Sequence, residues 1–136
     1  MTALAPKYVS ARRASGFMHE VSVRGHRFVV DEPAYLGGSD TAASPLELLA
    51  AALATCTAST VEMYAQRKGW ALESVEVDVV FTPPERDAPG HFELVLRLPA
   101  DLEPAQVERL EAVARKCPVR RTLERAVVED RLESSS

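Results

Sequence analysis

The sequence lacks a surplus of basic residues, and this absence argues against nucleic acid as a partner. Its 16 Lys and Arg are outnumbered by 20 Asp and Glu, which gives a net charge of −4 at pH 7. A nucleic-acid-binding surface normally shows a basic patch or stripe, but most basic residues here are dispersed. We interpret the one small cluster as a solvated surface, with a docking patch for an acidic carrier domain as the alternative. It comprises Arg115, Lys116, Arg120 and Arg121.

Long apolar runs are also missing. Residues 48–61 form the longest weakly polar stretch, but they include several Thr and Ser and fall short of the roughly 20 residues that span a bilayer. The first residues do not combine a charged start, an apolar segment and a small-residue cleavage site, as a secretory signal would. We therefore expect a cytoplasmic protein without a membrane partner, in which this stretch belongs to a core helix.

Histidine is scarce, and no metal site is predicted. His19, His26 and His91 have no cysteine or carboxylate at ligand spacing, so neither a zinc site nor a Cys-His nucleophile is supported. Low-complexity segments and repeats are absent as well, and a content of 46% hydrophobic and 26% charged residues is ordinary for a soluble globular protein. The length suits a single domain over residues 1–136 that folds without a disulfide.

The first third of the chain predicts strands. Alternating residues indicate strands at 8–13, 17–23 and 26–30, and Arg24-Gly25 fits a tight turn between the last two. We therefore expect a β-meander. The following segment, DEPAYLGGSDTAAS, is rich in Asp, Pro, Gly and Ser and is interpreted as a long connection.

A long helix is predicted from Pro45 to Lys68. Ser44 supplies an N-cap, Pro45 suits the first turn, and Glu47 completes a capping box. Gly69 supplies a left-handed cap at the other end. Because Ala and Leu occur on all sides of this segment, we expect the helix to be buried all round.

The rest of the chain predicts two strands, two helices and a last strand. The strands, 75–81 and 92–98, alternate in polarity and are joined by the Pro-rich loop TPPERDAPG. A helix follows at 104–116, Pro118 opens a short helix through Arg125, and residues 126–132 are expected to be a strand. The predicted fold class is α+β.

Two cysteines are the candidate chemical groups. Cys56 lies within the long helix, and Cys117 continues the apolar stripe of the 104–116 helix, so its thiol should point inward. The simplest interpretation is that each is a small buried hydrophobe. The functional interpretation is a redox pair, because a disulfide in a cytosolic protein is more often transient and catalytic than structural.

The local motifs around both cysteines resemble those of the OsmC/Ohr family of osmotically induced and organic-hydroperoxide-resistance proteins. The pattern begins with Gly-Gly-x-Asp at residues 37–40 and Ser-Pro-x-Glu-Leu-Leu at 44–49. It continues with Ala-Ala-x-x-x-Cys at 51–56 and Cys-Pro-Val at 117–119. Each motif is short, but their order and spacing are specific.

The resemblance implies a fold, an activity and a set of site residues. It implies an OsmC-like intertwined homodimer that reduces organic hydroperoxides without a metal, flavin or other cofactor. Cys56 corresponds to the peroxidatic cysteine and Cys117 to the resolving cysteine, and a dithiol such as a dihydrolipoyl protein is the reductant. The resemblance also implies that Glu47 holds an arginine from the N-terminal strands. Arg13 is our choice for that arginine, and Arg12 and Arg24 remain alternatives.

Thiol chemistry explains why an arginine is needed. An ordinary thiol, with a pKa near 8.5, is only a few per cent thiolate at neutral pH, and burial lowers that fraction further. Cys56 lies too far along the helix to benefit from the positive end of its dipole. Glu47 and Cys56 are nine residues apart, on opposite helix faces and about 13 Å apart along the axis. Either an arginine bridges them or a second subunit completes the site.

Two other functions fit the same sequence. The chain could be a binding protein of the same fold, with inert cysteines and a small apolar ligand in a groove at the subunit interface. It could also be a thiol redox sensor that forms the disulfide but turns over poorly with any dithiol. The pKa of Cys56 separates these functions, since a value near 8.5 argues against a peroxidase.

Overall fold

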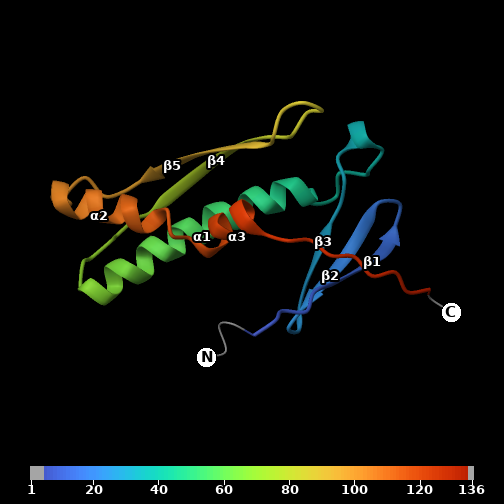
Figure 1. Ribbon diagram of the computed structural model, residues 1–136, viewed down its shortest axis with the longest axis horizontal. Helices are drawn as coiled ribbons and strands as arrows, with labels where there is room; N and C mark the ends of the chain where they lie inside the picture. The colour runs from blue at the N-terminus through green and yellow to red at the C-terminus, as the bar shows by residue number, and fades with distance from the viewer. Residues whose placement is uncertain (1–4, 135–136) are drawn as a thin grey trace. The chain divides into compact units, whose positions relative to one another are not determined.

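The computed structural model describes residues 5–134 and has the expected α+β architecture (Figure 1). Its internal contacts divide the chain into two compact units. The N-terminal unit ends at Leu49 and the C-terminal unit begins at Ala50, within the long helix α1. The first unit is a small sheet followed by a loop, and the second combines α1 with a hairpin and two shorter helices.

The N-terminal unit contains the predicted β-meander. Strands β1 (Ser10–Ser15), β2 (Met18–Val23) and β3 (His26–Val30) pair in chain order, and both neighbours are antiparallel. Arg24 and Gly25 form the expected turn, and both have positive φ, as a two-residue hairpin turn of the favoured twist requires. Strand β1 lies two residues later than predicted because its register with β2 pairs Ser15 with Met18 and leaves Gly16 and Phe17 in the turn.

A buried carboxylate organises the connection between β3 and α1. Asp31 is 1% exposed, and its carboxylate accepts hydrogen bonds from the Thr41 hydroxyl at 2.6 Å and the Thr41 amide at 3.0 Å. These bonds lower the pKa of Asp31, against the opposing effect of burial. Gly38 is required for a steric reason, since a Cβ there would lie 1.9 Å from the carbonyl oxygen of Glu32.

Helix α1 (Pro45–Lys68) begins and ends where the sequence predicts. The Ser44 amide donates to the Glu47 carboxylate at 2.8 Å, and the Glu47 amide donates to the Ser44 hydroxyl at 3.2 Å. This reciprocal pair is a capping box. At the other end Gly69 has φ +73°, and the Trp70 amide donates to the carbonyl of Ala65 at 2.9 Å. That bond is typical of a helix terminated by a left-handed glycine.

The prediction that α1 is buried all round is wrong. Its buried residues form one stripe at a spacing of four, namely Leu53, Thr57, Val61 and Ala65. Residues on other sides, such as Ala51, Thr55 and Ser59, are more exposed because the chain covers only one face of the helix. By length and composition alone α1 could also cross a membrane. Its buried stripe packs against Leu110 in a core, as in a globular domain.

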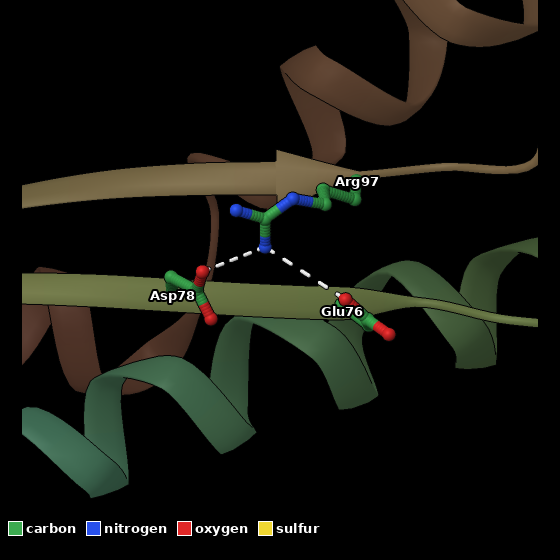
Figure 2. A network of polar contacts seen from close by, with 3 residues as sticks. All are labelled: Glu76, Asp78 and Arg97. Atoms are coloured by element: carbon green, nitrogen blue, oxygen red, sulfur yellow. Dashed lines mark hydrogen bonds and ion pairs between the residues drawn. The ribbon is translucent and has the colours of Figure 1, made fainter.

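The C-terminal unit has one antiparallel hairpin, β4 (Glu76–Thr82) and β5 (His91–Arg97). Alternate residues are half-buried, and Phe81 stacks on Phe92 with ring centroids 4.7 Å apart. On the exposed face, Arg97 lies between two carboxylates of β4 (Figure 2), with Asp78 at 2.7 Å and Glu76 at 3.8 Å. These exposed ion pairs help fix the cross-strand register but add little stability.

Two helices follow the hairpin, and the predicted last strand is absent. Helix α2 (Pro104–Ala114) ends two residues earlier than expected, and α3 (Pro118–Arg125) matches its prediction. Residues 126–132 are extended but pair with no strand in the part of the chain that the structure describes. Val127 and Val128 are 83% and 84% exposed there. Their β propensity alone is insufficient, because a strand also needs a partner with which to pair.

The core of the C-terminal unit is centred on three fully buried residues. Val61 and Ala65 of α1 pack with Leu110 of α2, which is 0% exposed. Trp70 packs at the edge of this cluster, with its ring 5.8 Å from that of Tyr64 in an edge-to-face arrangement. The core therefore fixes α1 against α2 and, through the following turn, fixes the position of Cys117.

Leu110→Ala should destabilise the C-terminal unit by about 2–5 kcal/mol, because it removes a fully buried side chain and leaves a cavity. The free energy of unfolding, measured by urea denaturation, checks this value. Glu108→Ala is the matched control on the exposed face of α2, and its effect should stay within about 0.5 kcal/mol. Equal effects of the two substitutions would contradict this assignment of the core.

Candidate active site

Cys56 lies in the middle of α1 and is only partly buried. Its neighbour on the helix surface is Thr60, whose hydroxyl donates to the Cys56 carbonyl at 2.7 Å and also contacts the Cys56 thiol. The sequence suggested a fully buried thiol, but one side of α1 remains uncovered by the chain. Cys56 is therefore the more accessible of the two thiols.

Cys117 is fully buried between α2 and α3, which confirms that its thiol points inward. It does not lie on α2 itself, because that helix ends at Ala114. Cys117 is instead the residue that precedes α3, and Pro118 occupies the first turn of that helix. The amide groups of Val119 and Arg120 lie close enough to influence the Cys117 sulfur, although neither forms a regular cap to it.

The structure brings the two predicted cysteines together. The thiols of Cys56 and Cys117 lie close enough for each to shift the pKa of the other, and both are reduced. The buried stripe of α1 and the break at Pro118 place them in contact although they are far apart in the sequence. A disulfide between them would join groups that are already neighbours.

The two thiols differ in acidity. Burial raises the pKa of Cys56, and the hydrogen bond and negative charge of Cys117 raise it further. Burial also acts to raise the pKa of Cys117, but hydrogen bonds from Cys56, the α3 amides and Thr57 outweigh this effect and lower it. The contact between the thiols thus acts in opposite directions, since it raises the pKa of Cys56 and lowers that of Cys117.

Thr57 is a residue of this site that the sequence interpretation missed. Its side chain is 2% exposed, and its hydroxyl donates to the Leu53 carbonyl at 2.8 Å and contacts Cys117. A signal was present in the sequence, because Thr57 lies four residues from both Leu53 and Val61. A polar residue on a buried helical stripe commonly has a specific partner.

Glu47 has the structural role that the capping box predicts. Its carboxylate is bound to the Ser44 amide, and this bond lowers the pKa of Glu47. The carboxylate is exposed and ionised at neutral pH, so it retains the charge needed to hold an arginine.

The candidate arginines all belong to the N-terminal sheet or its turns. Arg13 is on β1 and donates from Nε to the Gly16 carbonyl at 2.8 Å, within its own hairpin. Arg12 lies beside it on β1, opposite Glu20, and Arg24 occupies the β2–β3 turn. The main influences on the pKa of Cys56 are burial, Cys117, the Val119 amide and the Thr60 hydroxyl, and none of these is an arginine. Within residues 5–134, no group of three or more His, Cys, Asp or Glu side chains is arranged to hold a metal ion.

The chain matches one protein-family model over most of its length. The family model described as OsmC-like protein matches residues 37–129, which is more than half of the chain. The match includes α1 with Cys56 and the α2–α3 junction with Cys117. No curated protein matches the chain by sequence.

Solved structures share the fold at low sequence identity. A Psychrobacter arcticus protein assigned to osmotic stress induction and detoxification response has a TM-score of 0.76 at 16% identity, covering 84% of this chain and 85% of its own. An organic hydroperoxide resistance protein from Legionella pneumophila has a TM-score of 0.62 at 24% identity, covering 88% and 90%. A Vibrio cholerae protein assigned to organic hydroperoxide resistance, with captopril in one of its active sites, has a TM-score of 0.65 at 25% identity, covering 88% and 87%.

Cys117→Ala should lower the pKa of Cys56, because it removes the hydrogen bond and the charge that raise this pKa. The pH dependence of alkylation by iodoacetamide measures the change, with mass spectrometry to identify the modified residue. Thr55→Ala is the control, since Thr55 is on the exposed side of α1 and bonds only to helix carbonyls. A pKa of Cys56 that is unchanged or higher in Cys117→Ala would contradict the thiol contact.

Proposed function

The chain belongs to the OsmC-like protein family, and we propose that it is a thiol-dependent peroxidase that reduces organic hydroperoxides. The observation that carries this proposal is the proximity of the Cys56 and Cys117 thiols, each of which shifts the pKa of the other. Such a pair can pass from a sulfenic acid to a disulfide without recruiting a distant residue. Relatives of the same fold that are named for organic hydroperoxide resistance support the substrate class.

The proposed cycle has three balanced steps. The Cys56 thiolate attacks the O–O bond of ROOH, which forms the Cys56 sulfenic acid and releases ROH after one proton is taken up. The Cys117 sulfur then displaces the sulfenic oxygen, which leaves as water and yields the Cys56–Cys117 disulfide. A dithiol reduces this disulfide to two thiols and is itself oxidised to a disulfide.

Accessibility assigns the two roles. A hydroperoxide must reach the sulfur that it oxidises, and Cys117 is 0% exposed whereas Cys56 is partly exposed. Cys117 is therefore the better resolving group, because it needs to react only with its neighbour. Its lowered pKa favours this role, since resolution requires a thiolate nucleophile.

Activation of Cys56 is the remaining requirement. The raised pKa of Cys56 is opposite to what its attack on a hydroperoxide needs. We assign the missing positive charge to Arg13, held by the exposed carboxylate of Glu47, with Arg12 and Arg24 as alternatives. A guanidinium suits this role because it is always charged and can bind a carboxylate and a thiolate at once.

A homodimer is part of the proposal. Several large apolar side chains of the N-terminal unit are exposed, including Tyr8 at 80% and Phe28 at 43%. Val127 and Val128 near the C-terminal end are even more exposed. Apolar residues exposed in such numbers commonly mark a surface that another chain covers. We expect each subunit to contribute to the other's site, in a cytoplasmic protein whose dithiol reductant resembles a dihydrolipoyl group.

A thiol redox sensor is the second candidate function. The raised pKa of Cys56 favours it, because a slowly reacting thiol forms the disulfide only when peroxide accumulates. The sensor and the peroxidase share the disulfide and differ in turnover with a dithiol.

Cys56→Ser should abolish dithiol-dependent consumption of cumene hydroperoxide, with a loss on the order of 10³-fold or more, because it removes the nucleophile. Cys117→Ser should react once and then accumulate Cys56 with two added oxygens, since the sulfenic acid has no resolving thiol. Peroxide consumption and intact-protein mass spectrometry measure these outcomes. A Cys56→Ser protein that keeps the wild-type rate would refute the peroxidase, and a disulfide that forms without turnover would identify the sensor.

Arg13→Gln should raise the pKa of Cys56 and slow peroxide consumption about tenfold at neutral pH for each unit of that rise. The rate should recover at high pH, where Cys56 ionises without help. Arg13→Lys is the matched control because it keeps the charge, and Arg12→Gln and Arg24→Gln test the alternatives. If all three Gln variants retain the wild-type pKa and rate, activation by an N-terminal arginine is wrong.

A further inference from the structure

A cavity in the C-terminal unit reaches Thr57, which contacts Cys117, and four of its twelve lining residues are leucines. Its volume is about 530 Å³, which falls in the range of small-molecule sites. We call it the leucine cavity. Its apolar lining includes Leu94, Leu96, Leu98, Leu102, Val107 and Ala114, from β5, α2 and the segment that joins them.

Positive charge dominates the polar part of this lining. Arg115 and Arg120 contribute guanidinium groups, and Glu111 contributes the only carboxylate of the lining residues. Arg120 lies 3.8 Å from Glu124, in an exposed pair that leaves most of its donors free, and Arg115 makes no ion pair among residues 5–134. Arg120 also lines a second cavity, of about 650 Å³.

We propose that the leucine cavity binds an amphipathic carboxylate, with its hydrocarbon chain against the leucines and its carboxylate on Arg115 and Arg120. The leucines favour an apolar chain because each buried methylene is removed from water. The two guanidinium groups favour a planar anion that accepts paired hydrogen bonds. A cationic amphiphile of the same length lacks this charge complementarity.

This site differs from the place where a hydroperoxide meets Cys56. Neither cysteine lines the leucine cavity, but Thr57 does, and the Thr57 hydroxyl contacts Cys117. Arg120 adds a second connection, because its amide acts on the same sulfur. A bound carboxylate therefore lies one side chain away from Cys117, the buried member of the pair.

Isothermal titration calorimetry with fatty acids below their micelle concentrations tests this inference on the full chain. Decanoate should bind, and it should bind about tenfold more tightly than octanoate because it buries two more methylenes. Octylamine, of the same chain length as octanoate, should bind at least about tenfold more weakly than octanoate, because it loses the charge-assisted hydrogen bonds.

Substitution of the two arginines locates the site. The double variant Arg115→Gln/Arg120→Gln should weaken decanoate binding about tenfold or more and leave the affinity for octan-1-ol within about twofold of wild type. Arg121→Gln is the matched control, since it removes one charge from α3 but does not line the cavity, and it should bind decanoate like the wild type.

Three results would overturn the inference. They are no decanoate binding at millimolar concentration, equal affinity in the double variant and the wild type, or octylamine binding as tightly as octanoate. The readout is binding rather than turnover, so it is independent of the proposed peroxidase. A protein that binds decanoate but consumes no peroxide supports this site alone, and the reverse result supports the peroxidase alone.

Discussion

The close approach of the Cys56 and Cys117 thiols is the constraint on which the proposed chemistry depends. It exists because a buried stripe fixes α1 against α2, and because the chain leaves α2 at Ala114 and starts α3 at Pro118. Cys117 is the last of the three residues between these two helices and is covered completely. The core of the C-terminal unit thus serves as the scaffold that holds one thiol against the other.

The two thiols have different environments, which suit them to the different roles proposed for them. Amide and hydroxyl groups near Cys117 act to lower its pKa. Partial burial and the contact with Cys117 raise the pKa of Cys56. In the proposed cycle, these shifts favour Cys117 as the resolving thiol and disfavour the attack of Cys56 on peroxide. Activation of Cys56 therefore needs a positive charge beyond the groups that shift its pKa here, which is the role proposed for Arg13.

Local signals predicted the parts of the fold that local chemistry determines. The Ser44–Glu47 capping box, the Arg24-Gly25 turn and the Gly69 cap were all confirmed. Features that depend on neighbouring elements were predicted less well. Residues 126–132 have strand-like composition but no strand beside them, and α1 is apolar on faces that the chain leaves open. The short motifs identified both cysteines because they are local. The opposite pKa shifts of the two thiols were not predicted, because they depend on the three-dimensional contacts of Cys117.

Thr57 shows how the packing of this unit can connect a ligand to thiol chemistry. Its hydroxyl has one proton, which it donates to the Leu53 carbonyl at 2.8 Å. The same hydroxyl lies close enough to Cys117 to favour a lower pKa of that thiol. Because Thr57 also lines the leucine cavity, a single side chain joins the cavity to the buried cysteine.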